Sequence, residues 1–460
     1  MNKREFLAVG GAVPLMLAGC GGSGSGSAPV RLVNASVGYE TGLGFMVEST
    51  QATTSDVAYG AVSPFETVEA GSVDVTLNQG GSSVTSAQTR TIGKGTRYSL
   101  VAYGKVNELK SVLITESTTT PDTGKANINV LNVSTDIGAV DVYLSSTLTS
   151  PYVNQIDSNR SGVSQGSFTP MVPGDYYITV VGYLSVAKNL NDIRFQSTTK
   201  YTLVDQKTYT IILTPGASGV LANAIVLQQD NGGTSTSFTN STSRVRAVTA
   251  TGGLSVTVQG SSTTSGTTSA VNILSSATGA SAQYSEYKVV NTGTAPTVVV
   301  GGTTLTVHSS DWDGVTATAS IASLAAGGDY TLLIYVDSNG NPVAKAVEDD
   351  NTSPASSSGA KFRLINLAYN NPTSVLSMSV NSLSAASSIA FATASDYTEY
   401  TPPQTVSSTV EVFDGSDLLI TRSQVLTLAN IFTEIVVKYD SSAVNASKDF
   451  FRAAASSTTT

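Results

Sequence analysis

The sequence contains a single histidine, His308, beside residue types that hydrolytic chemistry uses. Ser309 follows it directly, and Asp311 comes shortly after. The members of a catalytic triad normally come from distant segments, and a serine nucleophile often sits in a Gly-x-Ser-x-Gly turn before a helix, a pattern that Ser309 does not match. We therefore interpret His308 as a polar loop residue, and a His-dependent hydrolase is the least favoured alternative.

The only tryptophan, Trp312, lies in the same segment. The apolar face of an aromatic ring suits the apolar face of a sugar, so Trp312 is a candidate for stacking on a ligand. An anchor partly buried at the base of a loop is the simpler interpretation, because tryptophan buries a large apolar area. The 19 tyrosines leave a similar choice between weak binding of glycans or peptides and packing at strand edges.

Two segments place oxygen ligands at close spacing. Residues 337–342 bring Asp337, Asn339 and Asn341 into an alternating pattern like that of a calcium loop, but a proline stands where that loop needs glycine. An Asn-Gly pair between apolar runs is instead typical of a hairpin turn. The acidic residues 348–351 could lend oxygens to a cation, but a solvated start of a linker is the simpler interpretation. The sequence predicts no metal and no cofactor.

The charge and cysteine content exclude several classes of protein. Charged residues make up 12% of the chain, against about 25% in ordinary soluble domains, and the formal net charge is −9. An acidic chain with so few cations is disfavoured as a nucleic-acid binder. One cysteine allows no disulfide within the chain, and one cysteine with one histidine cannot form a Cys/His zinc site.

The N-terminus resembles the export signal of a bacterial lipoprotein. Lys3 and Arg4 form a short positive region before the apolar residues 6–17. This apolar stretch is too short to span a bilayer, which takes about 20 residues, and has the length of a signal-peptide core. It ends in the four residues of a lipoprotein box: Leu17, Ala18, Gly19 and Cys20.

The resemblance implies cleavage before Cys20 and a diacylglycerol on its thiol. Each buried lipid methylene contributes about 0.8 kcal/mol, so several acyl chains anchor a protein stably. An aspartate directly after the cysteine would favour retention in the inner membrane. Gly21 stands there instead and favours the outer membrane. The sequence does not decide whether the protein faces the periplasm or the cell surface. The Gly- and Ser-rich residues 20–29 predict a flexible tether between the lipid and the first domain.

Four internal repeats organise the rest of the chain. Each opens with a similar phrase in which apolar residues alternate, and alternation is typical of a β-strand. A second shared phrase, clearest at residues 59–65, joins an aromatic residue to a Gly or Pro turn before another alternating strand. The equivalent residues in the four opening phrases are Asn34, Asn132, Thr249 and Asn366.

The predicted fold class is all-β, with tandem antiparallel β-sandwich domains of the immunoglobulin type after a lipoprotein signal peptide. Val, Ile and Thr dominate the predicted strands, and about seven strands per hundred residues fit a sandwich, with an eight-stranded barrel as the alternative. We expect alternate Ser and Thr side chains to form the solvent faces. We expect exposed linkers at residues 118–124, 231–242 and 351–359.

The sequence therefore divides into a signal peptide, a tether, four β-sandwich repeats and a disordered tail. Gly, Ser, Thr and Asn in the runs between the repeats support these divisions. The predicted bounds are, in that order, 1–19, 20–29, 30–117, 125–230, 243–350, 360–452 and 453–460.

The repeats resemble the bacterial domain of unknown function 4397. The resemblance rests on the opening phrase, on the Tyr-Gly-x-Val-Ser-Pro phrase of residues 59–64 and on the Ala-Gly turn that follows. Repeat 1 carries the pattern best, repeat 2 keeps residues 138–144, and repeats 3 and 4 depart from it. The resemblance implies tandem β-domains in an exported envelope protein and carries over no catalytic residues.

Together these features predict a non-enzymatic, lipid-anchored protein of the cell envelope whose β-domains are binding or structural modules. A carbohydrate-binding or adhesive surface protein is the first alternative, and an envelope hydrolase is the second. The expected partners are the membrane, through lipid on Cys20, and an envelope protein or polysaccharide. Binding to nucleic acid is not expected.

Overall fold

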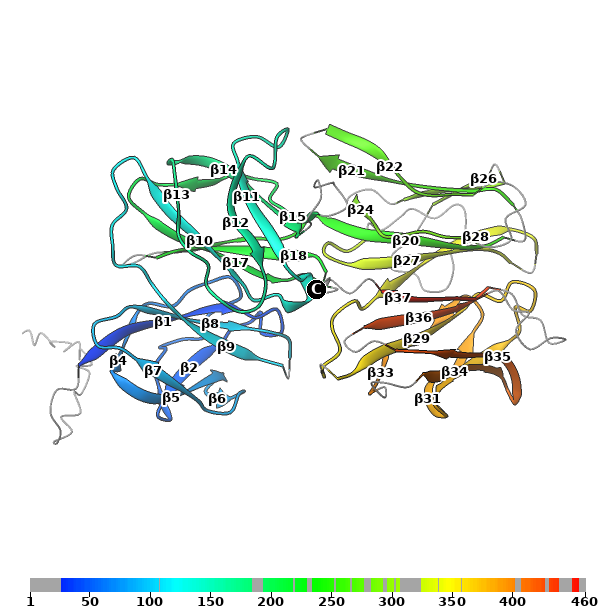
Figure 1. The fold of residues 1–460 in the computed structure, drawn as a ribbon, viewed down its shortest axis with the longest axis horizontal. Helices are drawn as coiled ribbons and strands as arrows, with labels where there is room; N and C mark the ends of the chain where they lie inside the picture. The colour runs from blue at the N-terminus through cyan, green and yellow to red at the C-terminus, as the bar shows by residue number, and fades with distance from the viewer. Residues whose placement is uncertain are drawn as a thin grey trace, which may run out of the picture.

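The computed structural model is built from β-strands in the part of the chain that it describes, which confirms the all-β prediction. Figure 1 shows two pairs of β-domains, with repeats 1 and 2 on the left and repeats 3 and 4 on the right. No helix within the described part is long and apolar enough to cross a bilayer. The described residues are 26–106, 108–183, 193–217, 220–229, 234–251, 254–264, 267–276, 283–292, 296–301, 303–306, 324–337, 339–356, 358–401, 407–426, 430–437 and 449–454.

Repeat 1 is a sandwich of two sheets. Its strands are β1 (Ser27–Ala35), β2 (Gly44–Val47), β3 (Thr50–Gln51), β4 (Glu66–Glu69), β5 (Gly71–Gln79), β6 (Ser82–Ser83), β7 (Gln88–Ile92), β8 (Tyr98–Tyr103) and β9 (Lys110–Thr115). One sheet has the order β4-β1-β8-β9, and the other has the order β3-β2-β5-β6 with β7 also paired to β5. Leu32, Phe45 and Leu100 are buried between the sheets.

Repeat 2 has the same plan with one additional edge strand. Its elements are β10 (Ala126–Asn132), the 3-10 helix η1 (Thr135–Ile137), β11 (Val140–Ser145), β12 (Asn154–Arg160), β13 (Thr169–Met171), β14 (Gly174–Gly182), β15 (Ile193–Gln196), β16 (Tyr201–Leu203), β17 (Thr208–Pro215), β18 (Ala222–Gln228) and β19 (Ser235–Phe238). The sheet orders are β13-β10-β17-β18-β19 and β12-β11-β14-β15, with β16 also paired to β14.

Repeat 3 pairs the sheet β23-β20-β27-β28, to which β24 adds, with the sheet β22-β21-β25-β26. Its strands are β20 (Thr242–Ala250), β21 (Val256–Thr264), β22 (Thr267–Ser276), β23 (Gln283–Tyr284), β24 (Lys288–Asn291), β25 (Thr297–Val300), β26 (Thr303–Thr306), β27 (Asp329–Val336) and β28 (Pro342–Asp349). Val258, Val298 and Leu332 are buried in its core.

Repeat 4 pairs the sheet β32-β29-β36-β37, to which β33 adds, with the sheet β31-β30-β34-β35. Its strands are β29 (Ala360–Asn366), β30 (Val375–Val380), β31 (Leu383–Ala390), β32 (Thr393–Ala394), β33 (Thr398–Tyr400), β34 (Ser408–Asp414), β35 (Asp417–Gln424), β36 (Ile431–Val436) and β37 (Asp449–Ala454). Phe362 stacks on Phe432 in the core, with ring centroids 5.1 Å apart.

The opening strand of every repeat has one parallel neighbour. β1 pairs with β8, β10 with β17, β20 with β27 and β29 with β36. The remaining pairings in these sheets are antiparallel, so each sandwich contains one mixed sheet. Alternation of side chains is the same in both kinds of pairing, so the sequence pattern cannot tell them apart.

The asparagine that ends the opening strand anchors the loop that follows. Asn34 Nδ2 donates to the carbonyl oxygens of Tyr39 and Val57, and its Oδ1 accepts from the Ser36 N–H. Asn132 and Asn366 make the corresponding three bonds in repeats 2 and 4. A buried amide must be hydrogen-bonded, so this residue fixes the chain direction after the strand.

The sheets that contain the opening strands are buried on both faces. One face lies in the core of its own repeat, and the other packs against the neighbouring repeat. The expectation that alternate positions face solvent is wrong for these sheets, because a second domain covers them. The side chains at the centres of the two domain interfaces are Val33, Val101, Leu131 and Ile212 between repeats 1 and 2, and Val248, Leu333, Ile365 and Ile435 between repeats 3 and 4.

Two stretches expected to be irregular contain strands. β1 begins at Ser27, inside the predicted tether of residues 20–29, and Ser27 pairs with Glu69 of β4. β19 lies inside the predicted linker of residues 231–242 and pairs with β18. Both segments are rich in small polar residues, but the first extends β1 along β4 and the second adds a strand to the edge at β18, which composition alone does not reveal.

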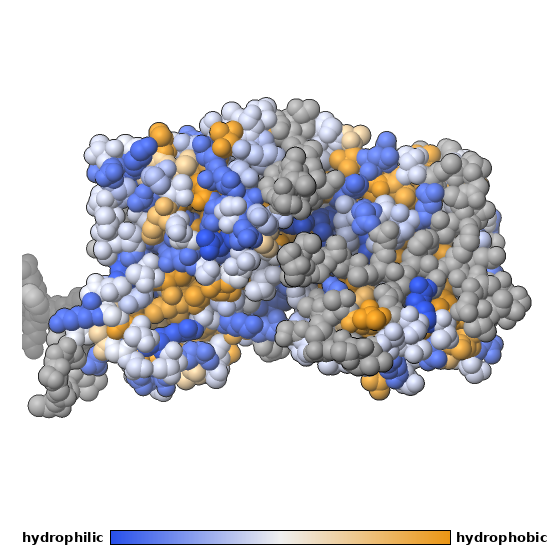
Figure 2. Space-filling model, in the orientation of Figure 1, coloured by the Kyte–Doolittle hydropathy of each residue, from blue (hydrophilic) through white to orange (hydrophobic). Residues whose placement is uncertain are grey.

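The start of the predicted linker at residues 351–359 is not exposed. Asn351 and Thr352 are both 6% exposed, and Asn351 Nδ2 donates to Asp329 Oδ2. The predicted tail also begins inside a strand, because β37 continues to Ala454. Figure 2 shows mostly pale and blue side chains on the visible face, with orange confined to smaller patches.

Candidate functional site

The lipidation motif and the residues of the predicted loop site lie outside the described part of the chain. They therefore stay predictions from sequence. Among the residues that the structure describes, no group of three or more His, Cys, Asp or Glu side chains could hold a metal ion. The predicted site residues outside the described ranges are Leu17, Ala18, Gly19, Cys20, His308 and Trp312.

Asp337 lies in the turn of the β27–β28 hairpin, as predicted. Its Oδ1 accepts from the N–H groups of Asn339 and Asn341. Gly340 has φ +83°, a conformation that glycine adopts without strain. The hydrogen bond from the Asn341 N–H is the main reason that the pKa of Asp337 is lowered. The carboxylate is thus a turn-forming group.

Asp349 is fully buried, so the prediction of a solvated linker start at residues 348–351 is wrong for it. Its carboxylate pairs with Arg246 of repeat 3 at 3.3 Å and with Arg363 of repeat 4, and it accepts from Thr331 Oγ1. Burial alone would raise the pKa of Asp349, but the charges of Arg363 and Arg246 hold it below its ordinary value. This carboxylate is a structural link between two repeats.

A buried arginine on the opening strand recurs in repeats 1, 3 and 4. Each guanidinium lies over an aromatic ring, a favourable cation–π arrangement. Burial raises the pKa of Tyr397 to about 12, so this ring stays neutral beneath its arginine. Arg31, Arg246 and Arg363 have their guanidinium carbons 4.6, 4.7 and 4.7 Å from the ring centroids of Phe65, Tyr287 and Tyr397, respectively.

A serine two positions before each ring fastens it to the opening strand. Ser63 N–H donates to the Leu32 carbonyl, and the Leu32 N–H donates to Ser63 Oγ. Ser285 with Ala247, and Ser395 with Leu364, form the same reciprocal pair. The serine of the shared second phrase therefore holds that phrase against the opening strand by two hydrogen bonds.

Repeat 2 departs from this arrangement in a consistent way. Asn129 replaces the arginine, and its Oδ1 accepts from Thr210 Oγ1. Gly166 takes the place of the serine and donates its N–H to the Val130 carbonyl. Phe168, at the position of the stacked ring, is 36% exposed. The aromatic side chain is thus most exposed where the arginine is missing.

Sequence reasoning missed the arginine, serine and aromatic set. The available signal was an arginine in the middle of an apolar strand, a residue that is almost never fully buried unless it is paired. Three of the four opening phrases carry it, followed at a distance by Ser-x-aromatic. The partner carboxylates lie far along the sequence, which is why the pattern alone did not connect them.

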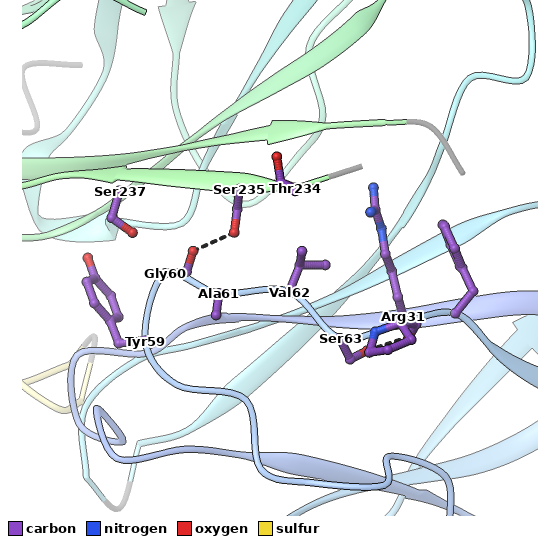
Figure 3. Close-up of a pocket in the computed structure, with 11 residues that line it drawn as sticks. Arg31, Tyr59, Gly60, Ala61, Val62, Ser63, Thr234, Ser235 and Ser237 are labelled. Atoms are coloured by element: carbon purple, nitrogen blue, oxygen red, sulfur yellow. Dashed lines mark hydrogen bonds between the residues drawn. The ribbon is translucent and has the colours of Figure 1, made fainter. Parts of the chain in front are cut away.

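An open groove of about 760 Å³ lies where residues 59–65 of repeat 1 pass β19 of repeat 2 (Figure 3). Ser235 Oγ donates to the Gly60 carbonyl at 2.6 Å, so the two repeats are in direct contact at this end. Tyr59 OH shares a hydrogen bond of 2.7 Å with Thr214 Oγ1. Arg31 lies toward the other end of the groove, as Figure 3 shows.

The groove is lined mainly by neutral polar groups and small apolar side chains. Arg31 contributes the charge, but its Nε donates to Glu116 Oε1 at 2.7 Å and its Nη2 donates to the Gln228 carbonyl at 2.9 Å. Burial raises the pKa of Tyr59, so its hydroxyl stays neutral. The hydroxyl groups in the lining belong to Tyr59, Ser63, Thr234, Ser235 and Ser237.

This lining suits a neutral ligand that exchanges hydrogen bonds with hydroxyl and amide groups. Binding sites typically combine apolar walls with a few polar groups that fix orientation, and the groove has both. The charge of Arg31 is already compensated by Glu116, with which it forms a buried ion pair. The arrangement can bind and orient a ligand, and it presents no activated nucleophile.

Comparisons with solved structures give low similarity. Family 41 carbohydrate-binding modules from streptococcal virulence factors match 40% of this chain and 93% of their own, at 10% identity and a TM-score of 0.16. A Bacteroides uniformis protein assigned to cell adhesion matches 50% of this chain and 100% of its own, at 11% identity and a TM-score of 0.20. Scores this low carry no argument about ligands. No curated protein matches the sequence. Residues 28–143, from β1 into β11, match the family model described as Domain of unknown function (DUF4397), as the sequence motifs predicted.

Proposed function

We propose that this chain is a non-enzymatic, lipid-anchored protein of the bacterial cell envelope whose paired β-domains present a binding groove. The groove between residues 59–65 and β19 carries the proposal, because it is open and lined by neutral hydrogen-bonding groups. The charge of Arg31 in its lining is already used in a buried ion pair with Glu116, and Arg31 also donates to the Gln228 carbonyl of repeat 2. The lipoprotein box ending in Cys20 supports the anchor.

The anchor is tested by fractionation of cells that express the Cys20→Ser variant. Only a thiol accepts the diacylglycerol, so we expect the variant to lose the lipid and to leave the washed membrane fraction. Ser23→Ala, a neighbouring change that keeps the thiol, should remain in the membrane fraction. A full-length Cys20→Ser protein that stays with the membrane would contradict the anchor.

A carbohydrate ligand is the second candidate, favoured by the hydroxyl groups that line the groove. We expect the purified protein to be retained on immobilised capsular or cell-wall polysaccharide. Thr234→Trp fills part of the groove and should reduce retention, whereas Thr67→Trp, at an exposed position on β4 outside the lining, should not. Trp312→Ala tests the predicted stacking residue separately. No retention on any envelope glycan would exclude this candidate.

A further inference from the structure

We propose that the end of the molecule where β1 begins rests on the membrane, with Val172 and Val204 in contact with lipid. The inference rests on the proposed anchor at Cys20. The first strand begins at Ser27, seven residues after that cysteine. Seven fully extended residues span at most about 25 Å, so this end of repeat 1 is held close to the bilayer surface.

Two turns of repeat 2 lie at the same end as Ser27. Arg31, which pairs with Ser99 near the start of β8, donates to the carbonyl of Gln228, and Gln228 pairs with Tyr209 near the start of β17. The Val204 N–H donates to Tyr209 OH, which places the turn before β17 at this end. Opening strands of repeats 1 and 2 therefore start at the same end of the pair.

The second turn is fixed by the pairing of β13 with β10. Met171 pairs with Ala126, the first residue of β10, so Val172 projects beyond the start of that strand. The next strand, β14, begins at Gly174, which pairs with Leu203 directly before Val204. Val172 and Val204 thus lie on neighbouring turns.

The opposite end of this domain pair is already occupied. Asp136 of η1, beyond the end of β10, accepts from the Ser353 N–H, which belongs to the chain between repeats 3 and 4. Figure 1 shows repeats 3 and 4 on the right of the first pair, while the described chain begins at the left. The end at Ser27 is therefore the one that a short tether can bring to a membrane.

The side chains at this end fit a lipid surface without strong electrostatic attraction. Val172 is 58% exposed and Val204 is 48% exposed. Exposed Lys125 and the exposed carboxylates Asp122 and Asp205 together carry one net negative charge, so charge does not draw this end to an anionic lipid surface. Two protruding valines add little binding energy, but acyl chains on Cys20 supply the attachment and the valines then determine the orientation.

The test uses the lipidated full-length protein in vesicles of phosphatidylethanolamine and phosphatidylglycerol. Cys20 is the only cysteine, and lipid blocks its thiol, so Val172→Cys and Val204→Cys each provide a single site for an environment-sensitive nitrobenzoxadiazole label. Leu383→Cys on β31, 57% exposed in repeat 4, is the matched control. We expect a blue-shifted emission, quenched by nitroxide-labelled lipid, at positions 172 and 204 but not at 383.

Intact mass separates the two ways in which this inference can fail. A diacylglyceryl-modified Cys20 together with water-like emission at positions 172 and 204 would overturn the orientation and leave the anchor standing. An unmodified Cys20 would overturn the proposed anchor and the orientation with it. Equal blue shifts at positions 172, 204 and 383 would also overturn the orientation, because the whole chain would then lie along the membrane.

Discussion

Asp349 links repeats 3 and 4 because one carboxylate neutralises arginines from both. Its side chain is fully buried between Arg246 on β20 and Arg363 on β29. The two guanidiniums hold its folded-state pKa below the unfolded value. Its stabilising contribution is therefore present above the unfolded value, near 4, and is lost as the pH falls through the lower folded value. Removing one partner of a buried ion pair strongly destabilises a protein, because the other charge stays buried without its counter-ion.

We predict that Asp349→Asn lowers the free energy of unfolding of the second domain pair by about 3–5 kcal/mol, because two buried guanidiniums lose their counter-ion. Denaturant unfolding followed by tyrosine fluorescence measures the loss. Asp417→Asn is the control, since Asp417 is exposed at the start of β35, and it should cost no more than about 1 kcal/mol. Equal effects of the two changes would contradict the role given to Asp349.

Glu434 is a buried carboxyl at a position where the other repeats have an aliphatic side chain. Its pairing partner on β29 is Leu364, and the corresponding residues of repeats 1 to 3 are Leu100, Ile211 and Leu332. Its nearest counter-ion is Arg422 Nη2 at 3.4 Å, and neither carboxyl oxygen has a hydrogen-bond partner among the described residues. Burial raises the pKa of Glu434 to about 7 against the opposing charge of Arg422.

We predict that repeat 4 loses stability as the pH rises from the unfolded pKa of Glu434, near 4.5, through the folded value near 7. Glu434→Leu should remove this pH dependence and raise the free energy of unfolding at pH 8 by about 3 kcal/mol. Thermal unfolding of the wild type and the variant across this pH range checks both effects. An unchanged pH slope in Glu434→Leu would assign the titration to another group.

At the scale of elements, alternation in the opening phrases identified β1, β10, β20 and β29 correctly. Alternation could not show that both faces of these strands are buried, since the second face is covered by a domain elsewhere in the sequence. The same limit applies to the candidate site. The phrase of residues 59–65 was visible as a motif, but its contact with β19 joins Gly60 to Ser235, which are far apart in the sequence.

The loop of residues 59–65 depends on glycine at position 60. Gly60 has φ +77°, and a Cβ built there would lie 1.8 Å from Ser237 Oγ on β19. We predict that Gly60→Ala destabilises the first domain pair by about 1–3 kcal/mol, through backbone strain and the contact with β19. Urea unfolding measures this loss.

A second change separates the two causes. Ser237→Gly removes the hydroxyl that the new methyl group would meet, so the double variant should regain the part of the loss that comes from contact and keep the part that comes from backbone strain. The single variant Ser237→Gly supplies the baseline. Additive effects of the two changes would show that residue 60 and β19 are not coupled.

At the scale of the whole molecule, the buried interfaces lead us to expect that a pair of repeats, rather than a single repeat, unfolds as one unit. Each pair shares an apolar interface as well as its two separate cores. A repeat without its neighbour would expose one complete face of its mixed sheet to water, and a large exposed apolar patch is unfavourable. The two pairs also contact each other through polar groups, as in the bond from the Ser353 N–H, between repeats 3 and 4, to Asp136 of repeat 2.

This organisation predicts which repeats lose stability together when a residue of one domain interface is truncated. Ile365 is fully buried in the interface between repeats 3 and 4, and truncation of a buried isoleucine costs about 2–5 kcal/mol. We expect Ile365→Ala to lower amide hydrogen-exchange protection in both repeats 3 and 4 and to leave repeats 1 and 2 unchanged. Ile212→Ala, at the interface between repeats 1 and 2, should lower protection in repeats 1 and 2 and leave repeats 3 and 4 unchanged. Loss of protection confined to repeat 4 would mean that the repeats unfold singly, and that the interface only holds together domains that are stable alone.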